Sequence, residues 1–240
     1  MKKILTTAIL CAGLVGFTAC DSFLDEDPKS SLTLDTYYKT SADIIGNVNY
    51  LYRDGAPDKM GNMTGAYRGS SLSVMNMVTG YFVNEYEGQE VDCSYARQLN
   101  RQDFTQSCCN YLTNNTWKDC YKSINVANAV IKYVDGVEMD NQAQYKAEAR
   151  FFRALNYFYL VKMFGDVPMV TEPTEDATLV DYPARTAASE VYSTIIIPDL
   201  LFAVENLPNA TFAGNSHRVT KYAADMLLAD VYMRLGEYAN

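Results

Sequence analysis

A polar stretch from Asn84 to Asn115 gathers the side chains of this sequence that are best suited to contact a ligand. Its aromatic and basic members stand among amides and acids, and they include Tyr86, Tyr95, Arg97, Phe104 and Tyr111. The stretch has little hydrophobic periodicity, so we expect a long loop. A loop of this length inside a compact domain often carries function.

Catalytic and metal chemistry find little support in the residue types. The chain has one histidine, His217, and a His-based metal site or a Ser-His-Asp triad would have to use it. It stands in NSHRVT, a predicted surface loop before a helix. Asp and Glu total 29, but nothing fixes two carboxylates at the defined separation that glycoside hydrolysis needs. We therefore expect a protein that is not an enzyme and uses no metal or other cofactor.

The first 20 residues have the pattern of an export signal. Lys2 and Lys3 are followed by an apolar run, Ile4 to Val15, that is too short for a permanent membrane span. The ending FTAC resembles the lipobox of bacterial lipoproteins, in which the Cys is acylated. We expect a signal peptide over residues 1–19, lipidation of Cys20 with palmitate-type acyl chains, and an acidic tether and lead-in over residues 20–40. Several acyl chains are what stable anchoring needs. The alternative is an ordinary secretory peptide with a structural Cys20.

Four further cysteines follow the signal, and they are Cys93, Cys108, Cys109 and Cys120. An exported protein can form disulfides, but no C-x-x-C spacing predicts a zinc ribbon. A bridge from Cys93 to Cys108 or Cys109 and free buried thiols both remain open.

The composition is that of an acidic, well-packed protein. The hydrophobic content of 48% is enough for a full core in 240 residues. The formal net charge is -9, and it becomes -11 when Lys2 and Lys3 leave with the signal. A chain this acidic is a poor nucleic-acid binder, because phosphate binding depends on Lys and Arg.

One segment, 145–168, is the strongest helix signal and must organise the rest. Apolar residues form two adjoining stripes that cover more than half of its surface, so the helix should be buried on several sides. Gly165 and Pro168 are predicted to end it. Its charged residues make no favourable pairs along the helix, and their partners must come from neighbouring helices.

Further helices are expected around this one. They span 41–53 with a Ser41 cap, 72–83, 117–134 with a Thr116 cap, 188–206 with a kink near Thr194 caused by Pro198, and a last helix that starts at Thr220. Asp140 is a possible cap for the central helix. The fold class is therefore all-α, with helical hairpins and long irregular loops, in one domain over 41–240. The ending LLADVYMRLGEYAN resembles half of a tetratricopeptide hairpin, so we expect an N-terminal part of a longer protein.

Ordered motifs carry a resemblance to a known family. They are Trp117-x3-Tyr121-x2-Ile124, AEARFFRA running into GDVP at 165–168, Glu190-Val191-Tyr192 with Leu207-Pro208, and Arg218-x-Thr220-Lys221. Together they resemble the SusD/RagB family of outer-membrane lipoproteins over essentially the whole mature chain.

The resemblance implies a surface-exposed, lipid-anchored protein of the cell outer membrane. Such proteins bind glycans or oligosaccharides and hand them to a SusC-type TonB-dependent transporter for nutrient uptake. It also implies that the matched motifs are mainly scaffold and that variable loops contact the ligand. The ligand-binding candidates of this chain are then Asn84, Tyr86, Asp92, Tyr95 and Arg97. Sugar ring faces stack on aromatic rings, and sugar hydroxyls pair with amides, carboxylates and Arg.

Three other functions are weighed against this one. The first is a RagB-type protein that takes up peptides. The second is a tetratricopeptide scaffold that binds proteins without handling nutrients. The third is a hydrolase with paired carboxylates, which product release from a pure glycan would reveal.

Overall fold

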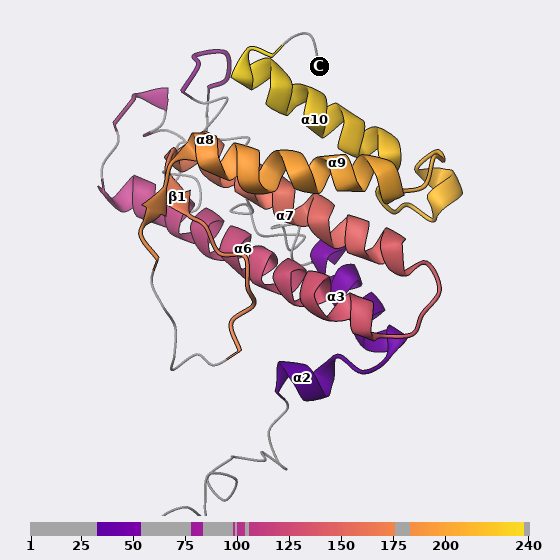
Figure 1. Cartoon of the computed structure of the whole chain (residues 1–240). Helices are drawn as coiled ribbons and strands as arrows, with labels where there is room; N and C mark the ends of the chain where they lie inside the picture. The colour runs from indigo at the N-terminus through magenta and orange to yellow at the C-terminus, as the bar shows by residue number, and fades with distance from the viewer. Residues whose placement is uncertain are drawn as a thin grey trace, which may run out of the picture.

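The computed structural model describes residues 33–53, 78–83, 98, 100–103, 106–175 and 183–237, with the backbone alone at 35, 53 and 106–115. Two long helices, α6 (Gln106–Tyr133) and α7 (Gln142–Phe164), form an antiparallel hairpin. A second hairpin is made by α9 (Ile197–Asn206) and α10 (Lys221–Leu235). Figure 1 shows the layering: α7 lies between α6 and α9, and α10 packs outside α9. The expected all-α hairpin architecture is confirmed.

Short elements complete the described part. They are α2 (Leu34–Tyr37), α3 (Ser41–Arg53), the 3-10 turns η3 (Val134–Gly136) and η6 (Ala213–Asn215), α8 (Ala188–Val191), the π-helical turn η5 (Tyr192–Ile196), and two strands, β1 (Val167–Pro168) and β2 (Arg185–Thr186). The strands pair antiparallel, with Val167 opposite Thr186. α3 packs on both α6 and α7. Tyr38, at the end of the expected lead-in, is buried and stacks on Tyr133.

Helix α7 is the core of the bundle, as its two apolar stripes predict. Its buried apolar residues are Ala147, Ala149, Phe151, Phe152, Ala154, Tyr157, Phe158, Leu160 and Val161. Each large apolar side chain buried in this way contributes about 1.5–3 kcal/mol relative to an exposed one. Gly165 ends the helix at φ 68, a backbone conformation that L side chains rarely adopt.

The expected kink near Thr194 is a π-helical turn. The helix 188–206 is divided by η5, and Pro198 stands directly after it in the first turn of α9. Proline has no N–H to donate, and its ring clashes with the carbonyl four residues earlier. The wider π turn accommodates this without ending the helix.

Several expected boundaries are wrong. α6 begins at Gln106, inside the stretch that we expected to be a loop up to Asn115, and Thr116 is a buried residue of this helix rather than its cap. Asn and Thr at 113–116 are weak helix formers, and tertiary packing overrides a propensity of well under 1 kcal/mol per residue. Residues 78–83, the end of the expected helix 72–83, form a turn with Gly80 at φ 78; residues 72–77 lie outside the described part.

The expected caps were also misplaced by one residue. Thr40 precedes α3, where its amide and hydroxyl donate to the Asp43 carboxylate at 2.8 and 2.7 Å. Ser41 is thus the first helical residue and not the cap. The cap of α7 is Asn141, in the left-handed conformation with φ 56, and not Asp140. Asn tolerates this conformation better than most residues, so the chain turns into the helix one residue later than expected.

The outermost helix, α10, is apolar on two sides. Ala224 and Val231 are buried against the bundle, whereas Tyr222, Met226 and Met233 are exposed on the opposite side. Within the described ranges, no helix is both long enough and apolar enough to cross a bilayer.

Candidate functional site

The ligand-binding candidates of the sequence, Asn84, Tyr86, Asp92, Tyr95 and Arg97, lie outside the described residues, as does Cys20. The structure describes both flanks of the segment that carries the five candidates. On one side are residues 81–83, and on the other are residues 98 and 100–103. The geometry of these flanks determines how the bundle presents the candidate segment.

The two flanks are joined by a hydrogen bond. The side-chain amide of Asn100 donates to the backbone carbonyl of Phe82 at 2.6 Å, across 18 residues of chain. The described residues on either side of the candidate segment therefore lie next to each other. We define this base as residues 81–83 together with Asn100.

Exposed aromatic side chains stand at the base. Tyr81 is 88% exposed, Phe82 is 54% exposed, and Val83 is also exposed. Large apolar side chains with this much exposure are uncommon away from binding surfaces when they occur together. The sequence reasoning missed Tyr81 and Phe82, because it assigned them to a helix over 72–83. The turn residues Thr79 and Gly80 were the available signal against that helix.

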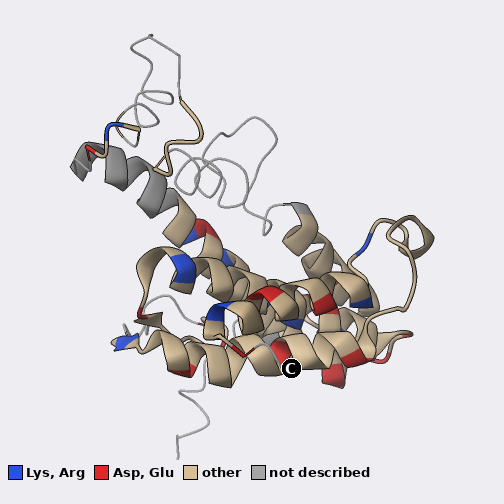
Figure 2. Ribbon diagram, turned by 90° about the horizontal axis from the view of Figure 1, so that it is seen from above, with Lys and Arg blue, Asp and Glu red and all other residues tan. Residues whose placement is uncertain are grey.

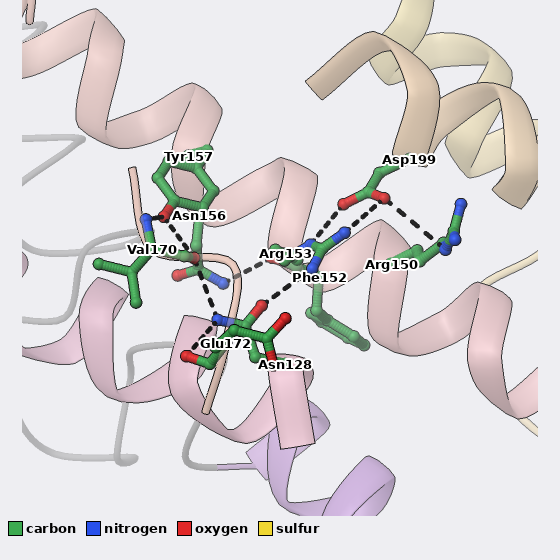
Figure 3. A network of polar contacts seen from close by, with 9 residues as sticks. All are labelled: Asn128, Arg150, Phe152, Arg153, Asn156, Tyr157, Val170, Glu172 and Asp199. Atoms are coloured by element: carbon green, nitrogen blue, oxygen red, sulfur yellow. Dashed lines mark hydrogen bonds and ion pairs between the residues drawn. The ribbon is translucent and has the colours of Figure 1, made fainter. Parts of the chain in front are cut away.

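A buried polar network joins the helices of the bundle, and Figure 3 shows it from close by. Arg153 of α7 donates from Nε and Nη2 to the two carboxylate oxygens of Asp199 of α9, at 2.6 and 2.9 Å. Its Nη1 donates to Asn128 of α6 at 2.9 Å. One side chain thus joins three helices, and Asp199 is only 2% exposed. Bidentate hydrogen bonds between Arg and a carboxylate are among the strongest hydrogen bonds in proteins.

The same network holds the segment that follows α7. The amide of Asn128 donates to the carbonyls of Val170 and Glu172, at 3.0 and 3.3 Å. The Tyr157 hydroxyl donates to the Val170 carbonyl at 2.9 Å and accepts from its N–H at 2.7 Å (Figure 3). Tyr121 adds a bond from its hydroxyl to the Pro168 carbonyl at 2.7 Å. An irregular segment without regular backbone partners is fixed in this way on two helices.

A second network joins the start of the bundle to its end. Glu148 of α7 is fully buried and accepts from Arg218, at 2.5 Å from Nη2 and 3.0 Å from Nε. The Tyr52 hydroxyl of α3 donates to the same carboxylate at 2.9 Å and accepts from the Val219 N–H at 2.9 Å. Burial of the Tyr52 hydroxyl is the main cause that raises its pKa, and the negative charge of Glu148 raises this pKa further. The expectation that partners of the charged residues lie on neighbouring helices holds for Arg153, which pairs with Asp199 of α9, whereas the cation that pairs with Glu148 is Arg218 in the loop before α10.

The side chains of these two networks are suited to hold the helices together and not to react with a substrate. Burial raises the pKa of Asp199, although Arg153 opposes the shift, and the ion pair leaves neither oxygen free for a substrate. Cys120 is buried as a free thiol, and burial raises its pKa. The described residues contain no group of three or more His, Cys, Asp and Glu placed to hold a metal ion. Acidic and basic residues are interspersed along the helices in Figure 2.

Comparison with known proteins identifies the family. A SusD-like family model, described as starch-binding associating with outer membrane, matches residues 22–233. The chain belongs to the SusD-like family. The SusD-like protein P2 of Formosa agariphila is 30% identical over 241 residues, which cover 99% of this chain and 44% of that protein.

Solved structures share the SusD-like fold. A laminarin-binding SusD-like protein superposes with a TM-score of 0.69 at 25% identity, over 83% of this chain and 41% of that one. A structure with xylogluco-oligosaccharide superposes with a TM-score of 0.60 at 24% identity, over 79% of this chain and 34% of that one. This SusD-like chain spans less than half the length of each relative.

Proposed function

We propose that this protein is a cell-surface lipoprotein that binds glycans and hands them to a SusC-type TonB-dependent transporter. The observation that carries the proposal is the family match over residues 22–233. The 25% identity to a protein that binds laminarin supports a carbohydrate as the ligand. On this proposal the protein binds its glycan and does not hydrolyse it.

Attachment to the outer membrane is assigned to Cys20. Acylation of this residue after removal of residues 1–19 would place the protein on the membrane by several lipid chains. The acidic tether would then separate the helical domain from the lipid. The description of the family as associating with the outer membrane supports this location.

The described structure supports a role in presenting a loop. The Asn100–Phe82 hydrogen bond brings together the residues on either side of the candidate segment, and Tyr81 and Phe82 expose aromatic rings next to this bond. Sugar rings have apolar faces that stack on such side chains, and their edges hydrogen-bond with amides and acids. We propose that the glycan contacts Asn84, Tyr86, Asp92, Tyr95 and Arg97 together with this aromatic base.

Binding is tested with a panel of three oligosaccharides and one control class. The full-length protein is titrated calorimetrically with maltoheptaose, a laminarin hexasaccharide and a xylogluco-oligosaccharide, and with mixed tryptic peptides. We expect heat from at least one oligosaccharide and no released product after prolonged incubation. Binding of the peptides alone would favour a peptide-uptake protein, and released sugar would establish a hydrolase.

A further inference from the structure

The described residues line a hollow at the surface that includes none of the ligand-binding candidates named above. It has a volume of about 620 Å³, within the range of small-molecule sites, and it is open to solvent. It is lined by the start of α3, by the connection from η3 into α7 and by the first turn of α7; the residues are Ser41, Ile45, Glu138, Met139, Asp140, Asn141 and Tyr145. In Figure 1 this place is at the end of the bundle where α7 begins.

The hollow is far from the aromatic base of the candidate loop. Asn100 precedes the start of α6 by six residues, whereas η3 follows directly after α6 ends. The 28 residues of α6 rise by about 40 Å at 1.5 Å per residue. A ligand in the hollow is therefore not part of a site at Tyr81 and Phe82.

The lining has the mixed character that a sugar needs. Glu138 and Asp140 offer carboxylate acceptors, Asn141 offers an amide, and Ser41 offers a hydroxyl. Tyr145 and Met139 pack on the core and give the hollow an apolar side. One face of the Tyr145 ring is covered by Arg218, 5.3 Å from the ring centroid, which holds the ring in place.

Glu138, Asp140 and Asn141 are exposed, so their side chains are accessible to a ligand in the hollow. Within the described part of the chain, neither Glu138 nor Asp140 forms an ion pair, and Lys146 of α7 pairs with Asp135 instead. The Asn141 side chain makes no capping bond to α7. Two carboxylates without a cation repel an anionic ligand, whereas sugar hydroxyls donate to carboxylates and accept from amides and hydroxyls.

We propose that this hollow is an accessory subsite for one or two neutral sugar units, separate from the loop site. The inference rests on the proposed glycan-binding function. A glycan bound at both ends of the bundle would be held by two weak contacts, and joint occupancy of linked sites raises the overall affinity. The N-terminus of a helix carries a partial positive charge that is stabilised by acidic residues nearby. This effect alone would account for the presence of Glu138 and Asp140 before α7 without any ligand.

Two variants distinguish a sugar subsite from a purely structural role of the acidic residues. Each variant has a matched control. Ser41→Leu fills the hollow from the first turn of α3, and Ser189→Leu makes the same change at an exposed position of α8. Asp140→Ala removes a carboxylate from the lining, and Glu205→Ala removes an exposed one from α9. All four are made in the full-length protein and titrated with the three oligosaccharides named above.

The subsite predicts two classes of binding in the wild type. Ser41→Leu should abolish the weaker class, Asp140→Ala should weaken it by about threefold to tenfold, and both controls should leave it unchanged. If a glycan binds and neither Ser41→Leu nor Asp140→Ala alters any class, the subsite is disproved and the proposed function stands. If no oligosaccharide binds the wild type, the proposed function fails, and this inference fails with it.

Discussion

The ion pair between Arg153 and Asp199 offers the sharpest test of how the bundle is held together. Replacing Asp199 with Ala removes both acceptors of the Arg153 fork, at 2.6 and 2.9 Å, and leaves a guanidinium in the core with only Asn128. Breaking a buried pair in this way costs about 3–5 kcal/mol. Because the free energy of unfolding of a domain is about 5–15 kcal/mol, the variant should lose a large part of its stability.

A double variant distinguishes the pair from simple loss of packing. Burial raises the pKa of Asp199 despite Arg153, so removing this carboxylate from water is costly even with its partner present. Arg153→Met combined with Asp199→Leu removes both charges and leaves the Asn128 acceptor without its donor, at a cost of about 1–3 kcal/mol. The double variant should therefore be more stable than Asp199→Ala alone.

The assay is urea unfolding followed by far-UV circular dichroism, with the midpoint compared at an unchanged m value. Glu175→Ala is the control, because it breaks only exposed contacts with Lys132 and Tyr133 and should shift the urea midpoint far less than Asp199→Ala. The reasoning is refuted if Asp199→Ala costs less than about 1 kcal/mol. It is equally refuted if the double variant is no more stable than Asp199→Ala.

Further predictions concern other parts of the molecule. Cys120 should not react with maleimide in the folded protein and should react in urea, because burial raises its pKa; peptide mass spectrometry reads this out. Tyr157→Phe should cost about 1–3 kcal/mol in urea unfolding, since the Val170 N–H loses its partner and the Val170 carbonyl keeps only Asn128. Gly165→Ala should cost roughly 1–3 kcal/mol from backbone strain alone, because nothing lies within 4 Å of the added Cβ. Replacing Tyr81 and Phe82 with Ala should weaken glycan binding by about tenfold or more in calorimetry and leave the urea midpoint unchanged, since both rings are exposed.

Local sequence signals predicted the central part of the fold. The two apolar stripes of α7, the glycine at 165 and the break caused by Pro198 each act within one or two turns of helix, so the sequence displays them directly. The start of α6 was missed because its Asn and Thr residues are weak helix formers that only the packed bundle keeps helical.

The partners of the buried charges could not be predicted from the sequence. Arg153 and Asp199 are 46 residues apart, and Glu148 and Arg218 are 70 residues apart. No local spacing relates such residues. A charge on a buried helix face indicates that a partner exists, because an unpaired buried charge is too costly, but it does not indicate which residue that is.

The most direct test of the account is a pull-down from the native outer membrane. The full-length tagged protein is extracted in mild detergent, and the proteins that accompany it are identified by mass spectrometry. The account predicts a large TonB-dependent barrel in near-equal amount, and an acylated N-terminal peptide that begins at Cys20. Recovery of soluble or periplasmic proteins without a barrel would contradict it and would assign the helical hairpins to a protein-binding scaffold.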